Sequence, residues 1–220
     1  MSTRASTPRT PAGGRLLAGL LAAGLLVGLL ALGGCAGGGG NEAAKPAAQI
    51  LTDAQAAAKN AASVHVVGDL NRAGGTGKLD LVATRNGDGH EEIVAAGRTI
   101  DIVKVGPTVY VQGLPGTGPG YRRLPAGDPR AAAFASRVDK NALFDQLVRP
   151  RDPATIIGTA PVGGQQAVQL KPQAGPGVLD VSADASHPYP LRLASSAQST
   201  ITFTDWDKPV TITAPRPGGN

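Results

Sequence analysis

Hydrophobic and polar residues alternate with a period of two through most of the chain beyond residue 62. Ile100 and Ile102, for example, flank Asp101, and Ile201 and Phe203 flank Thr202. Because successive side chains of a strand point to opposite sides of a sheet, this spacing predicts strands with one apolar and one solvated face. The predicted strands are Val64–Leu70, Lys78–Thr84, His90–Ala95, Thr99–Val105, Thr108–Gln112, Thr155–Thr159, Gln166–Lys171, Val178–Ala183, Leu191–Ser196, Thr200–Asp205 and Val210–Thr213.

The connections between these segments are short and rich in turn-forming residues. Arg85–Gly89 contains an Asn-Gly and an Asp-Gly pair, which favour tight hairpins, and Ala96–Arg98 is shorter still. Connections this short join antiparallel neighbours. The chain also holds 31 glycines and 18 prolines, as expected for a turn-rich β protein. We therefore predict the α+β class, with one large curved antiparallel sheet of about eleven strands.

Two helical regions interrupt this pattern. Ile50–Ala62 is an alanine-rich segment with Thr52 or Asp53 as its expected N-cap. The second region begins after a cap at Asp128, ends before Pro150, and contains a break near residues 139–141. A sheet of eleven strands curls, and other apolar groups must cover its concave apolar side. Either the helices fill it as an ordinary core, or a hollow remains.

The N-terminal segment has the pattern of a bacterial lipoprotein signal. Three arginines precede an uncharged run, Leu16–Gly34, and the only cysteine of the 220 residues, Cys35, follows directly. Leu32-Gly-Gly-Cys35 is similar to a lipobox, in which the cysteine is acylated and becomes the new N-terminus. The alternative is an uncleaved membrane anchor with an incidental cysteine, although 17 apolar residues are marginal for spanning a bilayer of ~30 Å.

These signals divide the chain into four parts. Residues 1–34 are the predicted signal peptide, 35–47 the lipidated cysteine and a flexible tether, 48–215 one folded domain, and 216–220 a tail. Cys35 then serves as an anchor and not as a nucleophile, and the expected location is the outer side of the cell membrane. Without residues 1–34 the chain has 18 basic and 16 acidic residues, which gives no case for nucleic acid.

Several short sequence segments of the domain resemble those of actinobacterial envelope lipoproteins of the LppX/LprG type, which share the unclosed barrel of the LolA and LolB lipoprotein carriers. These segments are Ser63–Gly68, Arg98–Gly106, Thr108–Gly113, Pro188–Leu193 and Ile201–Asp207. The resemblance implies an eleven-stranded half-barrel with helices across its mouth and a cavity for lipid acyl chains. It also implies a role in carrying or presenting lipids or glycolipids within the cell envelope.

The apolar side of the sheet supplies the candidate cavity residues. They are Leu79, Leu81, Ile100, Ile102, Val109, Val111, Leu179, Val181, Leu191, Leu193, Ile201 and Phe203. For each of them the alternative is plain packing between helix and sheet. The Gly113–Gly120 loop, with Tyr121, Arg122 and Arg123, either borders the mouth and meets anionic head groups or is a solvated hairpin end.

The partners expected from this reading are the membrane, through Cys35, a lipid or glycolipid ligand, and a membrane transporter. Two other functions stay open. One is a lipid-sensing or assembly module of the same fold, which binds a protein partner without transferring cargo. The other is a structural lipoprotein with a filled core.

Reaction chemistry finds little support in the sequence. Gly74–Lys78 is similar to a phosphate loop, but Arg72 and Leu79 stand where glycine and a hydroxyl residue are needed. Asp88–Glu92 gathers carboxylates and a histidine without the spacing of a metal site, and we expect a solvated turn there. No nucleophile elbow occurs. We therefore expect neither an enzyme nor a metal or organic cofactor.

Overall fold

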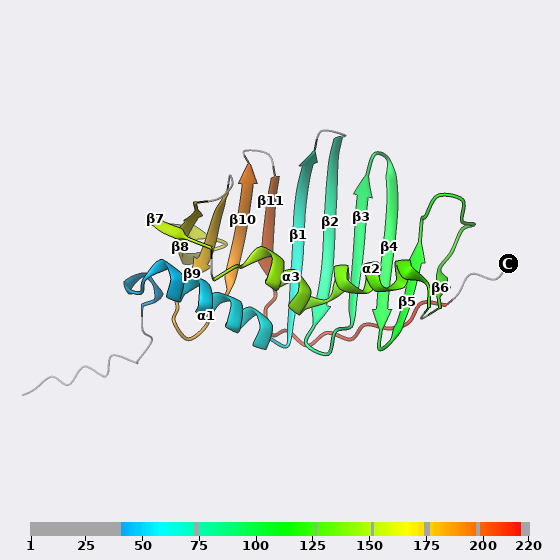
Figure 1. Cartoon of the computed structure of the whole chain (residues 1–220), viewed down its shortest axis with the longest axis horizontal. Coiled ribbons are helices and arrows are strands. Elements are labelled where there is room, and N and C mark those ends of the chain that lie inside the picture. Colours follow the sequence, from blue (N-terminus) through cyan, green and yellow to red (C-terminus); the bar gives the residue numbers. More distant parts are fainter. Residues whose placement is uncertain are drawn as a thin grey trace, which may run out of the picture. The chain divides into compact units, whose positions relative to one another are not determined.

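The computed structural model describes residues 41–72, 75–125, 127–150, 152–173, 177–196 and 199–216. In this part of the chain, eleven antiparallel strands form one sheet in the order β6-β5-β4-β3-β2-β1-β11-β10-β9-β8-β7 (Figure 1). The strands are β1 (Ser63–Arg72), β2 (Gly75–Thr84), β3 (Gly89–Ala95), β4 (Arg98–Val105), β5 (Thr108–Gln112), β6 (Arg122–Leu124), β7 (Ala154–Val162), β8 (Gln165–Pro172), β9 (Val178–Ser182), β10 (Pro190–Ser196) and β11 (Ser199–Thr204). The predicted α+β class with a large, unclosed antiparallel sheet is confirmed.

The strand order explains why helices cover the sheet. Two runs of consecutive hairpins, β1 to β6 and β7 to β11, meet where β1 pairs with β11. Consequently β6 and β7, which are consecutive in sequence, lie at opposite edges. The chain between them must cross ten strand spacings of ~4.8 Å, or about 48 Å. A helical crossing spans this width with its backbone hydrogen bonds satisfied internally.

In the part of the chain that the structure describes, three α-helices lie on the same side of the sheet, which we call the inner face (Figure 1). They are α1 (Ala47–Asn60), α2 (Pro129–Val138) and α3 (Lys140–Leu147), and a short 3-10 helix, η1 (Glu42–Ala44), precedes them. α2 contacts β2 to β5, whereas α1 contacts β7, β10 and α3. Within the described residues, no helix is long and apolar enough to cross a bilayer. Residues 1–40, including the predicted signal and Cys35, lie outside the described residues.

The helix ends match the sequence only in part. Asp128 caps α2 by accepting from the Arg130 amide, and Asp139 both ends α2 and caps α3. The predicted caps of α1 are wrong, because the helix begins almost two turns before them, after Pro46. The Pro46 carbonyl accepts the amides of Gln49 and Ile50, so the helical hydrogen bonds already start there. Thr52 and Asp53 lie inside the helix.

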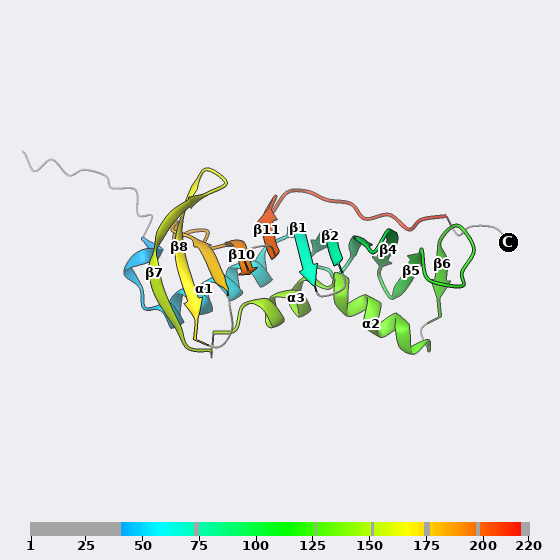
Figure 2. The same ribbon diagram turned by 90° about the horizontal axis from the view of Figure 1, so that it is seen from above.

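The predicted strand Val210–Thr213 is also wrong. Residues 208–216 run as an irregular segment along the side of the sheet that faces away from α2 and α3, which we call the outer face (Figure 2). The amide of Asp207 donates to the Ser63 carbonyl at the start of β1 (3.2 Å), and the Ser63 hydroxyl donates to the Lys208 carbonyl (2.6 Å). Both sides of β1 are already taken by β2 and β11, so no strand edge is free for a further partner there.

The inner face carries the main apolar core. In the register, Val66 lies opposite both Leu81 and Phe203, and all three are at most 2% exposed. The helices add Ile50, Val138 and Phe144, each fully buried, and ring contacts of 5.4 Å join Phe144 to Phe203 and to Trp206. The alternation in the sequence therefore places one apolar face under the helices, as predicted.

Candidate functional site

The inner face brings most of the candidate cavity residues into one cluster. Seven are buried there, namely Leu81, Ile102, Val109, Val111, Leu179, Val181 and Phe203. Four more are partly buried against them, namely Leu79, Ile100, Leu193 and Ile201. Most of this cluster is tightly covered; Ile102 and Val111, for example, are at most 1% exposed in the region that α2 crosses.

Leu191 does not join this cluster. It lies with Val162 and Ala167 in a second, small apolar cluster. The pairing of β10 with β9 shifts between Pro190 and Arg192, where Leu191 is an extra residue of β10 without a partner on β9. A bulge of this kind interrupts the strict alternation, so Leu191 and Leu193 do not share a face although they are two residues apart.

An apolar cleft opens on the inner face at the other half of the sheet. Its walls come from α1, from the end of α3 and from strands β7 to β10. The apolar lining comprises Leu51, Leu147, Ala154, Leu170, Pro172, Leu179 and Leu193. The polar lining comprises Gln146, Arg149 and Asp152, and the cleft measures about 180 Å³. Only two of the twelve candidate residues, Leu179 and Leu193, border it.

The size of this cleft limits what it accommodates without a structural change. A methylene group is about as large as a water molecule, at ~30 Å³, so the cleft holds roughly six methylenes. At ~0.8 kcal/mol for each buried methylene, this gives about 5 kcal/mol of favourable transfer free energy. That is enough for the end of one acyl chain and well short of a two-chain lipid.

An ion pair between a buried carboxylate and a half-exposed arginine fastens α2 to the sheet beside the cluster. Glu91 of β3 lies opposite Leu81 and Ile102 in the register, and its side chain is 4% exposed. Arg137 of α2 donates to both of its carboxylate oxygens, at 2.8 and 2.9 Å. A bidentate pair of this geometry satisfies a carboxylate that would otherwise be unpaired in an apolar region.

A buried lysine fastens the end of α1 to α3. Lys140 is 1% exposed, and its ammonium group donates to the carbonyls of Ala58 and Lys59 at 2.6 and 2.7 Å. These carbonyls belong to the last turn of α1, where helical partners run out and the helix dipole favours a cation. Burial lowers the pKa of Lys140 to about 8, and the nearby positive charge of Arg85 acts in the same direction.

The segment just before α1 is fixed to the sheet as well. The amide of Glu42 donates to the Ala183 carbonyl at the end of β9 (3.0 Å), and Lys45 pairs with both Glu42 (2.7 Å) and Asp53 (2.5 Å). Burial raises the pKa of the Glu42 carboxyl, which is fully buried. η1 thus lies within the 35–47 segment that the sequence predicts as a tether.

Sequence reasoning did not single out Glu91, Lys140 or Glu42. One signal was present for Glu91, because it stands in phase with Ile93, on the apolar side of its strand. Lys140 directly follows the break between the two helices, but nothing in its neighbours indicates burial. Glu42 was assigned to a mobile segment, and its burial depends on a strand that is far away in the sequence.

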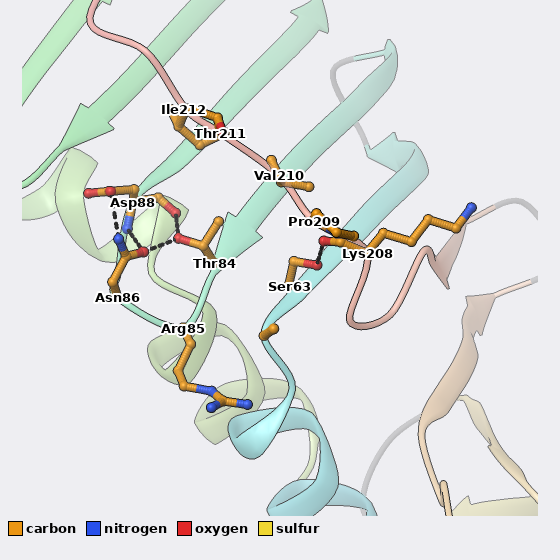
Figure 3. Close-up of a pocket in the computed structure, with 11 residues that line it drawn as sticks. Ser63, Thr84, Arg85, Asn86, Asp88, Lys208, Pro209, Val210, Thr211 and Ile212 are labelled. Atoms are coloured by element: carbon orange, nitrogen blue, oxygen red, sulfur yellow. Dashed lines mark hydrogen bonds between the residues drawn. The ribbon is translucent and has the colours of Figure 1, made fainter.

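A second cleft lies under the irregular C-terminal segment (Figure 3). It measures about 540 Å³, and residues 208–212 face Thr84, Asn86 and Asp88 of the turn between β2 and β3 across it. These polar groups bind one another: Thr84 donates to the side chain of Asn86 and to the Asp88 carbonyl (2.8 Å), and Asn86 donates to Asp88 (2.9 Å). They stabilise the turn, so this cleft is a weaker candidate for a ligand site.

The remaining candidate segments stand apart from the inner cleft. Tyr121 donates to Asp101 (2.5 Å), while Arg122 and Arg123 are exposed on β6, at the opposite edge of the sheet from β7. They therefore do not border the cleft between α1 and β7 to β10. Within Asp88–Glu92, Asp88 accepts from the Gly106 amide and His90 pairs with Asp101. In the described part of the chain, no three His, Cys, Asp or Glu side chains gather as metal ligands.

The fold is similar to that of two mycobacterial proteins of known structure. LprF from Mycobacterium bovis matches with a TM-score of 0.53 and 20% sequence identity, over 78% of this chain and 97% of LprF. Lipoprotein LppX from Mycobacterium tuberculosis matches with a TM-score of 0.50 and 13% identity, over 76% of this chain and 97% of LppX. The predicted resemblance in fold to the LppX/LprG type is thereby confirmed.

The remaining comparisons found little or no similarity. A LolA superfamily protein from Nitrosomonas europaea aligns with 72% of the chain at a TM-score of 0.27 and 11% identity. No protein-family model matches the chain, and no curated protein is similar to it in sequence.

Proposed function

We propose that this protein is a membrane-anchored lipoprotein that binds lipid acyl chains between the inner face of its sheet and its helices, and that it carries or presents lipids within the cell envelope. The observation that carries the proposal is the leucine-lined cleft between α1 and strands β7 to β10. The similarity in fold to LprF and LppX supports it. Cys35 is the proposed acylation site and holds the domain on the extracytoplasmic face of the membrane.

Binding in this site is burial and not reaction. Each methylene moved from water into the cleft contributes ~0.8 kcal/mol, and leucine side chains accept a chain without selecting one head group. A full-length chain requires more room, so α1 has to move away from the sheet as the chain enters. The composition of α1 suits this movement, because two of its four buried side chains, Ala54 and Ala58, are alanines.

The polar contacts that fasten each helix indicate which helix moves when a chain enters. The bidentate pair of Glu91 and Arg137 holds α2, and Lys140 ties only the last turn of α1 to α3. The middle of α1 is held to α3 by Gln55, which donates to the Val148 carbonyl (2.8 Å) and to Asp145 (3.2 Å). Among its described contacts it has no ion pair to the strands that line the cleft. We therefore assign the opening to the middle of α1.

A variant that fills the cleft tests this function. Ala154 borders the cleft, and Ala154→Trp places a large ring in it. Val94→Trp is the control, because Val94 lies on β3, away from the cleft, and is 36% exposed. The full chain is produced in a bacterial host, purified, and its lipid extract analysed by mass spectrometry. We expect Ala154→Trp to reduce the bound lipid several-fold and Val94→Trp to leave it unchanged.

Two results would contradict the proposal. One is wild-type protein without any bound lipid, and the other is equal lipid in the wild type and in Ala154→Trp.

The small volume of the cleft favours one alternative, a lipid-sensing or assembly module that holds a chain end and binds a protein partner without transferring cargo. Transfer of labelled lipid between vesicles separates the two functions. A carrier accelerates the transfer, whereas a sensing module binds lipid and leaves the transfer rate unchanged.

A further inference from the structure

Two adjacent isoleucines are exposed on the edge strand β7. Ile156 is 41% exposed and Ile157 is 51% exposed. Among the residues that the structure describes, β7 pairs with β8 alone, so its other side is an open sheet edge. Large apolar side chains on an exposed edge are unfavourable in water and mark a surface that contacts something else.

These isoleucines adjoin the mouth of the inner cleft. Ile156 lies directly opposite Leu170 in the register and two residues beyond Ala154, and both of these residues line the cleft. Residues two apart on a strand share a face, so Ile156 extends the apolar lining outward to the edge of the sheet. Arg149, which also lines the cleft, and Lys171, opposite Thr155, are both exposed beside it.

The geometry of β7 disfavours another strand as the partner. The register shifts between Ile156 and Gly158, and Ile157 is the extra residue of this bulge. Gly158 has a φ of 153°, and Pro161 further along lacks an amide hydrogen. A bulge and a proline on an edge both hinder the addition of a strand. A surface that accepts isolated apolar side chains, without strand pairing, fits this edge better.

The length of chain before the described residues points to the membrane as that surface. Glu42 binds Ala183, and the Ala183 amide donates to Gln166 of β8 (2.8 Å). Gln166 is four residues from Leu170, or ~13 Å along the strand. Residues 36–41 span at most ~20 Å. An acylated Cys35 therefore keeps Ile156 and Ile157 close to the bilayer, since only these ~13 Å along the strand and the ~20 Å of residues 36–41 separate them from it.

We propose that Ile156 and Ile157 insert into the lipid surface in which Cys35 is anchored, so that the cleft mouth opens toward the bilayer. This inference rests on the proposed anchor at Cys35. Interfacial side chains of this kind reach ~5–10 Å into the boundary between head groups and acyl chains. Arg149 and Lys171 then meet anionic head groups, while Asp145 and Asp152 are acidic residues beside Arg149. A lipid passes from the bilayer into the cleft without crossing water.

Site-directed fluorescence tests the docking. The acylated mature protein is reconstituted into vesicles of phosphatidylcholine and phosphatidylglycerol, where an introduced cysteine is the unique free thiol. An environment-sensitive dye is attached in Ile157→Cys, and in Val210→Cys as the control. Val210 is 39% exposed, similar to Ile156, but it lies on the outer-face segment (Figure 3). We expect a blue shift and several-fold less iodide quenching at position 157, and no change at position 210.

Equal quenching at both positions would overturn the docking, as would a protein that does not associate with the vesicles. Ile156→Cys provides a second labelled position if Ile157→Cys does not fold. Replacing both isoleucines by serine separates this inference from the proposed function. We expect the lipid content of the purified double variant to stay normal and its uptake of lipid from vesicles to slow several-fold. Protection at position 157 in a protein without bound lipid would support docking and refute the carrier.

Discussion

Lys140 makes the stability of this protein depend on pH in an unusual direction. Its side chain is buried, so the folded state holds its proton less tightly than the unfolded chain does, with a pKa of about 8 against the ordinary value of 10.5. Between these two pH values the unfolded state binds more protons, and stability therefore rises with pH. The stabilising contribution is complete above pH 10.5 and is lost as the pH falls through 8.

The size of this rise in the free energy of unfolding follows from the shift in the pKa of Lys140. Each pKa unit corresponds to 1.36 kcal/mol, which gives an upper limit of roughly 3 kcal/mol for the rise between pH 8 and 10.5. The hydrogen bonds to Ala58 and Lys59 favour the charged amine and reduce this figure. We therefore expect a rise of about 1–3 kcal/mol, equivalent to ~2–4 °C in Tm for each kcal/mol in a domain of this size.

Urea unfolding of the wild type and of Lys140→Met, followed by circular dichroism from pH 7 to 10.5, measures this effect. Methionine keeps the buried stem and removes the ionisable group. Burial raises the pKa of Tyr189 to about 12, so tyrosine ionisation in the unfolded state lowers stability above pH 10 in both proteins. The difference between the two proteins cancels this contribution. If the wild type and Lys140→Met depend on pH in the same way, Lys140 does not titrate in a buried site and the reasoning fails.

Two further substitutions test how the helices are held. Arg137→Ala leaves Glu91 buried without its partner, and because Arg137 is half-exposed we expect a loss of about 2 kcal/mol in urea unfolding, against less than ~0.5 for the exposed Arg130→Ala. A double variant with leucine at positions 91 and 137 should recover most of that stability, and no recovery would show that the clamp is not the cause. Gly89→Ala brings a Cβ within 2.6 Å of the Val138 carbonyl at the end of α2, whereas Gly118→Ala meets nothing within 4 Å. We expect a fall in Tm of several degrees for the first and almost none for the second; equal Tm values would mean that α2 does not pack against β3 as described.

The local pattern of the sequence was sufficient for most strands of the sheet, for the Asp128 cap of α2 and for the break between α2 and α3. Period-two alternation depends only on the geometry of a strand, and Asp128 and Asp139 are helix caps within their own turns. The start of α1 was misplaced because Thr52 and Asp53 are also plausible caps, and local signals do not decide between neighbouring turns. Val210–Thr213 has a strand pattern, but strand pairing requires a free edge, and the order of the other strands leaves none at β1.

The sequence by itself determined which residues are apolar and which side of each strand they occupy, because these follow from composition and backbone period. Only the tertiary structure decided how much of that apolar face the helices fill. Val109 and Val111 resemble Leu179 and Leu193 in the sequence pattern, yet the first pair belongs to the half of the sheet that α2 covers and the second pair borders the open cleft. The difference arises because the crossing from β6 to β7 places its helices unevenly over the sheet. That path is set by pairing between strands distant in sequence, which no local pattern encodes.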